Sequence, residues 1–404
     1  MPSPLRRNRD FVLLQSGQLL SSLGSQSSAI AYPLLVLAMT GSASGAGVVG
    51  FAAMLPRALL SLPAGLAADR WNRRWLMVGA DAVRAAAVGG LAAVVLLDRA
   101  ALWLMALVAF VEGSGSALFA ACQPGALRAV VPAEQLPAAS GVVAGRQAAV
   151  QLGGSPLGGA LFAVARALPF VVDAASYALS TASLLAVRAP FQAPRERSTA
   201  STRAQLAEGF AFQWRQPFLR ACAIVFSVGN FLIPGVLLAL VVVGERQGLS
   251  GAGIGLLTAS LGAALLVGSL ISPLVRRALP VRAVLLLELW TWLGFAAFLV
   301  RPDAYVLAGC LALLGLAIPS TDSVVHGYRI AMTPDRLLGR AEAARTTIAL
   351  AIAPLGPLLA GALLERAPAR AMVGAFAGCG VALAVWGSLS PGLRHVPRLP
   401  AAEA

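Results

Sequence analysis

Ionisable side chains inside long apolar stretches offer the chemistry that this sequence could perform. Glu112 stands in "AFVEGSGSALF", and Asp322 stands in "PSTDSVVHGY", with His326 four residues later on the same predicted helix face. Charged groups are rare in apolar segments long enough to cross a membrane, and they usually mark functional positions. A carboxyl that burial keeps protonated near neutral pH can release its proton when its surroundings open to water. We therefore expect Glu112 to couple proton movement to another process, with Asp322 and His326 as second candidates.

Arginines in the same kind of segment need an anionic partner. Arg57 could meet Asp81 or a carboxylate of a bound molecule, and the sequence leaves both open. Asp81 and Arg84 lie three residues apart, so they can face one another on a helix, and a self-neutralising structural pair is favoured over a binding role. Arg146 could meet Glu112 or a bound molecule. Structural roles are favoured for two further acids, Asp173 and Glu288.

Uncharged polar side chains gather on the first apolar segment. Gln15, Gln18, Ser22, Ser25 and Gln26 could hydrogen-bond a polyfunctional organic molecule, and Asn230 is a further candidate in the second half of the chain. The same groups could instead hold helices together, because hydroxyl and amide groups form hydrogen bonds between helices in lipid. The two interpretations stand equal at this point.

The elements that position these side chains follow from the composition. Hydrophobic residues make up 58% of the 404 residues and charged residues only 12%, whereas soluble domains carry about a quarter charged side chains. The apolar residues occur in runs of about 20, the length that spans a hydrocarbon core as a helix. The sequence therefore predicts an integral membrane protein.

Charged, proline and glycine residues separate the apolar material into twelve segments. In the first half the segments lie near 11–38, 44–68, 75–97, 101–122, 138–165 and 167–187. In the second half they lie near 218–243, 252–275, 281–300, 304–326, 342–364 and 371–390. The predicted fold class is an all-α integral membrane protein with twelve transmembrane helices.

Internal similarity divides the chain into two halves. "GSASGAGVVG" at 41–50 resembles "GLSGAGIGLL" at 248–257, and "GGSPLGGAL" at 153–161 aligns with "LGPLLAGAL" at 355–363. This duplication predicts two pseudo-symmetric six-helix bundles. Their expected bounds are 1–187 for the first bundle, 188–217 for a cytoplasmic linker with a short amphipathic helix, 218–390 for the second bundle and 391–404 for a cytoplasmic tail.

Arginines indicate the orientation in the membrane. With the N-terminus inside, most of them fall in inner loops, such as Arg70 and Arg276, and few fall in outer loops, such as Arg99. Cytoplasmic loops of membrane proteins carry an excess of basic residues. We therefore expect a protein of the cytoplasmic (inner) membrane with both termini in the cytoplasm. The formal charge of +14 then needs no nucleic-acid partner.

The sequence lacks residues that several kinds of chemistry require. The sequence contains no lysine, so all 31 basic residues are arginines and a phosphate-binding Walker A loop, which requires lysine, is excluded. The 4 cysteines occur singly, without a CxxC pair, so neither a metal site nor a disulfide framework is predicted. We expect no cofactor and no catalytic site.

The string "GLAADRWNRR" at 65–74 follows the second apolar segment. It resembles the signature G-x-L-x-D-R-x-G-R-R of the major facilitator superfamily, and Asn72 replaces the usual glycine. The resemblance implies a conformational latch between spans two and eleven, with Arg340 or Arg345 near its acid. We expect close helix contact at its glycine and a positive φ at Asn72. The latch residues would be Gly65, Asp69, Arg70, Arg73 and Arg74.

Further strings sharpen the resemblance. "QPGALRAVVP" and "FVVDAASYALS" look like the drug and siderophore efflux branch of that superfamily. "GGSPLGG" is a weak form of an antiporter motif, with Gly154, Pro156 and Gly159 in the matching places, although such a helix could equally be a packing surface. Many members of the branch have Asp where Ser25 stands, so a coupling role of that acid would lie elsewhere in this chain.

The resemblance implies a secondary transporter that exports a drug-like compound, siderophore or secondary metabolite by proton antiport with alternating access. Uptake of a small solute by symport or facilitated diffusion is the alternative, and a membrane scaffold or enzyme is a third possibility of another class. The implied partners are a small-molecule substrate, protons and membrane lipid, without nucleic acid. Members of the superfamily usually act as monomers.

Overall fold

The computed structural model describes residues 5–191, 202–334 and 337–397, and these residues form helices without any strand. Ten helical stretches within them are long and apolar enough to cross a membrane. The chain is therefore a multi-pass membrane protein, as its composition predicts. It divides into two compact units, one of residues 1–196 with 244–259 and one of residues 197–243 with 260–404.

Two further long helices fall outside these ten because they are more polar. They are α1 (Arg9–Thr40) and α5 (Leu136–Val164). Glutamine and serine interrupt α1, and Arg146, Gln147 and Gln151 interrupt α5. Counting both helices gives an arrangement consistent with twelve membrane segments, and the polar residues that distinguish them recur below as the wall of a cavity.

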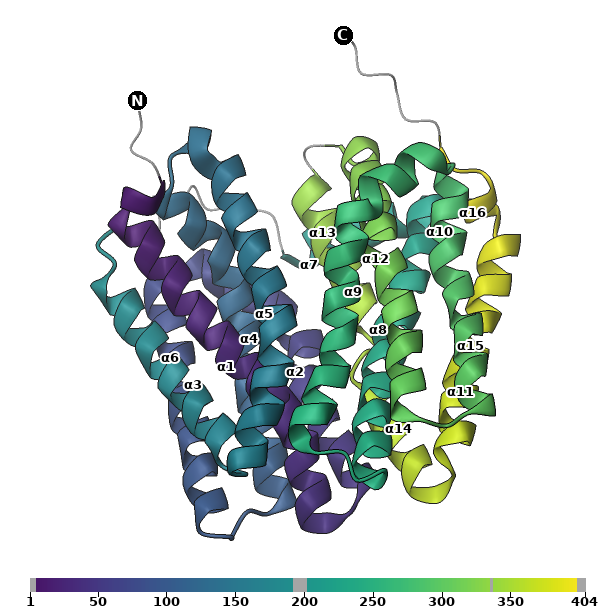
Figure 1. The fold of residues 1–404 in the computed structure, drawn as a ribbon. Helices are drawn as coiled ribbons and strands as arrows, with labels where there is room; N and C mark the ends of the chain where they lie inside the picture. The colour runs from purple at the N-terminus through teal and green to yellow at the C-terminus, as the bar shows by residue number, and fades with distance from the viewer. Residues whose placement is uncertain (1–4, 192–201, 335–336, 398–404) are drawn as a thin grey trace. The chain divides into compact units, whose positions relative to one another are not determined.

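The first unit contains six long helices. Besides α1 and α5 these are α2 (Ala43–Arg70), α3 (Arg73–Leu96), α4 (Leu102–Val130) and α6 (Leu168–Ala186), with the short turns η1 (Leu5–Arg7) and η2 (Ala133–Gln135). They run side by side in Figure 1, coloured purple to teal. Helix α1 packs on α5 and α6, α2 packs on α4, and α3 packs on both α4 and α6.

Asn72 begins α3 in a way that differs from the expectation. Its φ is −66° and its side chain accepts hydrogen bonds from the backbone of Arg74 at 3.0 Å and Trp75 at 3.4 Å. The expected positive φ is therefore wrong. Asn72 is an N-cap that satisfies two otherwise unpaired N–H groups of the helix, a position that asparagine favours.

The second unit contains long helices together with several short or interrupted ones. They are α7 (Thr202–Arg215), α8 (Pro217–Arg246), α9 (Gly251–Ala278), α10 (Val281–Trp290), η3 (Thr291–Phe295), α11 (Ala296–Val300), α12 (Ala304–Met332), α13 (Leu338–Leu350), α14 (Leu355–Arg366), α15 (Ala369–Leu389) and α16 (Pro391–Arg394). The first part of α9 groups with the first unit and the rest with the second.

Two segments predicted as single helices are interrupted. The segment near 281–300 changes from α10 to the 3-10 turn η3 before α11. Side chains three residues apart eclipse in a 3-10 helix, and here Trp292 and Phe295 stack with ring centroids 4.8 Å apart. The segment near 342–364 breaks between α13 and α14, where Pro354 lacks the N–H that a continuous helix requires.

Helix α7 is packed against α13 within the second unit. Glu208 forms an ion pair with Arg340, and a Cβ added to Gly209 would overlap the Arg340 backbone. The segment before α7, residues 192–201, lies outside the described residues. Arg340, expected beside the latch acid, is thus paired with Glu208, and Arg345 is paired with Glu342 at 2.6 Å.

Candidate functional site

A cavity of about 500 Å³ lies among the helices of the first unit. Its wall is formed mainly by glutamine, serine and arginine side chains from α1, α2, α3, α4 and α5. The lining residues are Gln18, Ser21, Ser22, Ser25, Gln26, Arg57, Arg84, Ser116, Phe119, Ala120, Gln123, Arg146, Gln147, Val150 and Gln151. Four of the five polar residues of α1 predicted as candidates are among them, and the fifth, Gln15, is buried elsewhere.

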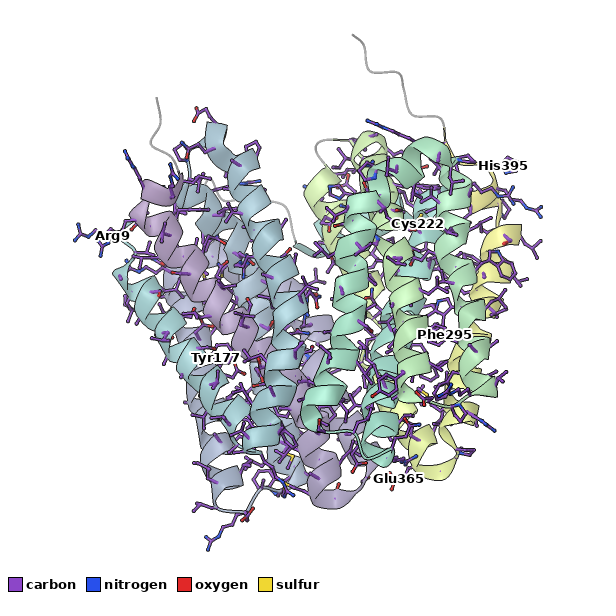
Figure 2. The ribbon with its side chains drawn as sticks, in the orientation of Figure 1. Arg9, Tyr177, Cys222, Phe295, Glu365 and His395 are labelled. Atoms are coloured by element: carbon purple, nitrogen blue, oxygen red, sulfur yellow. The ribbon has the colours of Figure 1, made fainter. Side chains whose placement is uncertain are left out.

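Behind this wall, Tyr177 of α6 is the centre of a buried hydrogen-bond network. Its hydroxyl donates to Glu112 Oε1 at 2.9 Å and accepts from Arg84 Nη2 at 2.6 Å. Tyr32 of α1 donates to the other Glu112 oxygen at 3.0 Å. Tyr177 is fully buried and lies near the middle of the first unit's helices in Figure 2. Glu112 is thus held by phenols from two different helices.

The expected pair of Asp81 and Arg84 is present on α3. Arg84 Nη1 donates to Asp81 Oδ1 at 3.0 Å, and Ser180 of α6 donates to the other carboxylate oxygen at 2.6 Å. The Arg84 guanidinium also lies 4.0 Å from the centre of the Tyr177 ring, in the position of a cation–π contact. Asp81 is inaccessible to solvent and Arg84 is 6% exposed.

Asp173 of α6 adds a third carboxyl to this network. It is fully buried, and it lies within electrostatic reach of both Glu112 and Arg84. Sequence analysis assigned Asp173 a structural role, yet it is a direct neighbour of the first coupling candidate. The carboxyls of Asp81, Glu112 and Asp173 therefore all lie within electrostatic reach of one guanidinium, that of Arg84, and Asp81 contacts it directly.

Small residues beside Glu112 allow close packing. A Cβ added at Gly113 would overlap the carbonyl oxygen of Ala53 on α2, and one added at Gly115 would overlap the Arg84 side chain. These glycines therefore make room for a neighbouring helix and for the arginine of the network.

The other two arginines of the cavity wall have no acidic partner among the described residues. Arg146 donates to the Gln18 carbonyl oxygen at 3.1 Å and to Ser22 Oγ at 3.0 Å, so its contacts are with α1 and not with Glu112. Arg57 is exposed at the cavity and makes no hydrogen bond or ion pair with any described residue, Asp81 included.

Polar side chains on α1 partly bond to neighbouring helices. Gln123 of α4 donates to the Gln18 side chain at 3.1 Å. Ser25 Oγ lies 2.7 Å from the Tyr177 hydroxyl and accepts from Arg84 at 3.4 Å. Gln26 donates to Ser155 at 3.4 Å. Both interpretations of these residues therefore hold at once, because they join helices and still border the cavity.

The signature string lies at the end of α2 and the start of α3. Arg73 pairs with Asp69 at 3.4 Å and donates to the Ala68 carbonyl oxygen at 3.0 Å, while Arg74 donates to the Leu184 carbonyl oxygen at 3.0 Å. Arg70 is exposed. A Cβ at Gly65 would meet no described atom within 4 Å. Within the described residues of the first unit, no other helix therefore packs closely on Gly65.

The antiporter-like string on α5 lies in tight packing. Added Cβ atoms at Gly154 and Gly158 would overlap Gln26 and the Ser27 backbone of α1, and Ser27 donates to the Gly154 carbonyl oxygen at 3.1 Å. Gly159 faces the backbone of Gly251, in the part of α9 that belongs to the first unit. Pro156 lies within α5 between these glycines.

The second-unit candidates lie on α12 in a separate group of charges. Asp322 and His326 are both exposed. His326 Nδ1 lies 2.7 Å from an Arg329 nitrogen, and Arg329 pairs with Glu342 at 3.0 Å. Asp322 is within electrostatic reach of Arg345. These contacts tie α12 to α13 through alternating charges.

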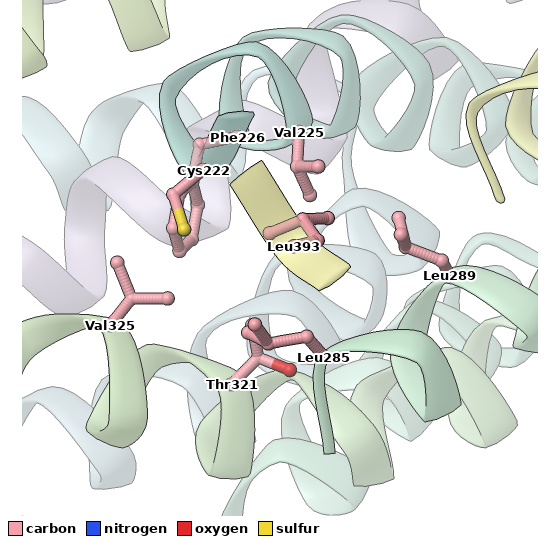
Figure 3. Close-up of a pocket in the computed structure, with 8 residues that line it drawn as sticks. All are labelled: Cys222, Val225, Phe226, Leu285, Leu289, Thr321, Val325 and Leu393. Atoms are coloured by element: carbon pink, nitrogen blue, oxygen red, sulfur yellow. The ribbon is translucent and has the colours of Figure 1, made fainter. Parts of the chain in front are cut away.

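The structure also describes two other polar residues of the second unit. Asn230 is a half-buried residue of α8, and Glu288 of α10 lies near Asp322. A small pocket of the second unit, shown in Figure 3, is lined by Cys222, Val225, Phe226, Leu285, Leu289, Thr321, Val325 and Leu393. Its volume of about 10 Å³ holds no more than one water molecule.

Sequence analysis missed several members of the first-unit site. Tyr177 follows Asp173 by four residues, so one helix face carries both, and this spacing was a usable signal. Gln147 and Gln151 have the same spacing in a segment otherwise apolar enough to cross the membrane. Tyr32 gave no such signal, because its contact with Glu112 depends on how α1 packs beside α4.

Comparison with known sequences gives a family match and full-length relatives. The sequence model described as Major Facilitator Superfamily matches residues 15–289. The multidrug efflux pump Tap of Mycobacterium tuberculosis is 26% identical over 411 residues, covering 97% of this chain and 96% of that protein. Macrolide efflux protein A of Streptococcus pyogenes is 22% identical over 364 residues, covering 88% of this chain and 89% of that protein.

Solved structures share the fold at low sequence identity. A mutant of the nucleoside transporter NupG superposes with a TM-score of 0.73 at 14% identity, covering 95% of this chain and 98% of that one. A bacterial homologue of the iron transporter ferroportin, in an inward-facing state, superposes with a TM-score of 0.68 at 19% identity. The match covers 95% of this chain and 99% of that one. These similarities concern the arrangement of helices alone.

Proposed function

The chain belongs to the major facilitator superfamily, and on this premise we propose that it exports a drug-like compound, a siderophore or another secondary metabolite in exchange for protons. Relatives named multidrug efflux pump and macrolide efflux protein support export over uptake. Transporters of this superfamily alternate access by rocking one half against the other around a site between them. The exchange then takes place across the cytoplasmic membrane.

One observation carries the proposal. Arg84 and Ser25 belong both to the cavity wall and to the hydrogen-bond network around Tyr177. A molecule in the cavity can therefore touch side chains that bond to the Tyr177 hydroxyl, which in turn donates to the Glu112 carboxyl, without entering the buried network itself. The substrate site and the proton site are adjacent but distinct.

The charges of the network favour proton uptake. One guanidinium, that of Arg84, faces the carboxyls of Asp81, Glu112 and Asp173, so full ionisation would leave two uncompensated negative charges. Like charges in a buried site disfavour one another's ionised form, and interacting carboxyls titrate as a group. We assign the exchangeable proton to the pair of Glu112 and Asp173, because Asp81 has both Arg84 and Ser180 as direct partners.

Coupling follows from the shared arginine. Protonation of the carboxyls weakens the hold of the network on Arg84, so that its guanidinium can move into the cavity and occupy the space in which the substrate binds. A substrate that fills this space keeps Arg84 against the carboxyls and so favours their ionised form. Each ligand thus lowers the affinity for the other by the same factor, which is the requirement for antiport.

The remaining sequence expectations enter as parts of this proposal. Asp69, Arg70, Arg73 and Arg74 form the latch that controls opening, and Gly154, Pro156 and Gly159 form a tightly packed segment of α5 that limits its movement against α1. Both termini lie in the cytoplasm, as the distribution of arginines favours. The protein acts as a monomer.

The test is transport by purified protein in sealed liposomes. We expect the membrane-impermeant anion 5-carboxyfluorescein to accumulate inside the liposomes when the interior is made acidic, and not to accumulate in protein-free liposomes. This accumulation should stop when a protonophore dissipates the gradient. Dye movement in the same direction as the protons would instead indicate symport. The proposal would be contradicted if a proton gradient moved no macrolide, siderophore or other efflux substrate.

A further inference from the structure

The charge of the cavity wall points to the kind of molecule that the first unit accepts. We propose that the transported substrate is an organic anion whose carboxylate or other oxyanion binds at Arg57, an inference that rests on the proposed export function. Its uncharged part lies along the amide and hydroxyl groups of α1 and α5. This assigns a substrate class to a cavity for which the efflux relatives define only a broad activity.

The cavity wall carries positively charged side chains and no negatively charged ones. Three arginines line the cavity, whereas no aspartate or glutamate is among its lining residues. Five glutamines and four serines supply most of the remaining polar groups, and Phe119 is the one aromatic ring. A cationic amine would find neither a counter-ion nor an aromatic cage on this wall.

The three arginines differ in how far the protein neutralises them. Arg84 has Asp81 at 3.0 Å and the Tyr177 ring at 4.0 Å. Arg146 donates to a carbonyl and a hydroxyl of α1, which are neutral groups. Arg57 has no hydrogen bond or ion pair with any described residue. Positive charge therefore remains at Arg146 and, above all, at Arg57.

An unpaired guanidinium within a membrane-spanning helix is costly unless something compensates its charge. Arg57 lies in the middle of α2 and borders the cavity. Guanidinium binds carboxylate through two parallel hydrogen bonds, which are stronger than neutral ones. The same geometry repels a cation. An anion in the cavity supplies the partner that α2 lacks, and Gln26, Gln147 and Gln151 can accept or donate to whatever polar groups the rest of the molecule carries.

The experiment compares two dyes that share a xanthene ring system but differ in charge. The anion 5-carboxyfluorescein and the cation rhodamine 123 are titrated against the full-length protein in nanodiscs of neutral phosphatidylcholine, and binding is followed by fluorescence anisotropy. We expect the anion to bind about tenfold more tightly than the cation. Arg57→Gln should remove this preference, Arg57→Lys should keep it with weaker binding, and the exposed loop variant Arg99→Gln should leave it unchanged.

Several results would overturn the inference. These are equal or tighter binding of rhodamine 123 by the unmodified protein, absence of binding by either dye, or a preference for the anion that Arg57→Gln leaves intact. The unmodified protein alone tests the first two, so the result does not depend on how well a variant folds.

The proposed export function can fail separately. If the anionic dye binds with the expected preference but no proton gradient moves it, export by proton exchange is wrong and the anion site stands. If a proton gradient drives export of a cationic drug while the dyes rank in the opposite order, export stands and the anion site is wrong.

Discussion

The Tyr177 hydroxyl donates to the Glu112 carboxylate at 2.9 Å, from a helix that lies 65 positions further along the chain. The same hydroxyl accepts from Arg84 at 2.6 Å. A single phenol therefore connects the arginine that borders the cavity with the buried acid behind it. Substitutions along this connection separate the contribution of the proton site from those of the cavity and of helix packing.

Glu112→Gln should abolish proton-driven transport while the protein still folds and inserts. The amide keeps the shape of the side chain and one of the two oxygens that accept from Tyr32 and Tyr177, and its NH2 can donate to the other phenol, but it cannot exchange a proton. We expect the rate of gradient-driven transport in liposomes to fall at least about a hundredfold, within the range for losing one proton-transferring group. Exchange of labelled for unlabelled substrate without a gradient should persist.

Glu134→Gln is the control for this substitution, because Glu134 is an exposed residue of η2. Its transport rate should equal that of the unmodified protein. Gradient-driven transport that survives in Glu112→Gln would transfer the coupling role to Asp322 and His326.

Tyr177→Phe should destabilise the protein and alter the dependence of transport on pH. Without the hydroxyl, Arg84 and Glu112 each lose a buried hydrogen-bond partner, which costs about 1–3 kcal/mol of unfolding free energy per unsatisfied group. The thermal unfolding midpoint in detergent and the transport rate between pH 5 and pH 9 measure the two effects. Tyr305→Phe is the matched control, since Tyr305 is 63% exposed, and an equal change in both variants would argue against the network.

Gly113→Ala should weaken the packing of α4 on α2. The added Cβ would overlap the carbonyl oxygen of Ala53 and lie 3.3 Å from Pro56, and backbone atoms cannot move aside as a flexible side chain can. We expect a loss of about 1–3 kcal/mol, as for other overpacked sites. Gly79→Ala meets no described atom within 4 Å and should be neutral or stabilise α3 by up to about 1 kcal/mol. Equal unfolding midpoints for the two variants would contradict this account.

Asp69→Asn should slow turnover without changing substrate affinity. The Asp69 side chain is 60% exposed and its ion pair with Arg73 is 3.4 Å long, so the pair contributes at most about 1 kcal/mol to stability. Asp69 is also absent from the cavity wall. Transport rate and dye binding, measured on the same preparation and compared with Asp98→Asn, distinguish the two effects. A weakened dye affinity in Asp69→Asn alone would mean that the latch and the cavity are not separate.

Local patterns predicted the features that depend on sequence spacing. The pairing of Asp81 with Arg84 follows from their separation along one helix, whatever packs against it. Apolar length likewise predicted the membrane helices, although α1 and α5 required their polar residues to be interpreted as a cavity wall. The polar residues that make α1 and α5 less hydrophobic than the other membrane helices were therefore the sequence signal of the cavity.

Features that depend on tertiary packing were out of reach. The two phenols on Glu112 come from helices 80 and 65 positions away, and no local pattern encodes which helices will meet. Arg146 was expected to meet Glu112 or a bound molecule, and only the packing of α5 on α1 shows that it donates to Gln18 and Ser22. Asn72 illustrates a local ambiguity, because asparagine suits both a positive φ and an N-cap, and the start of α3 selects the second.

The arginine-bearing wall has an energetic consequence for the cell. When a monovalent anion leaves as one proton enters, both movements carry positive charge inward, so two elementary charges cross per cycle. A resting voltage of about 100 mV, negative inside, contributes about 2.3 kcal/mol for each of them. Voltage alone would then sustain an outward concentration ratio of roughly a thousandfold, even where the medium outside is as alkaline as the cytoplasm.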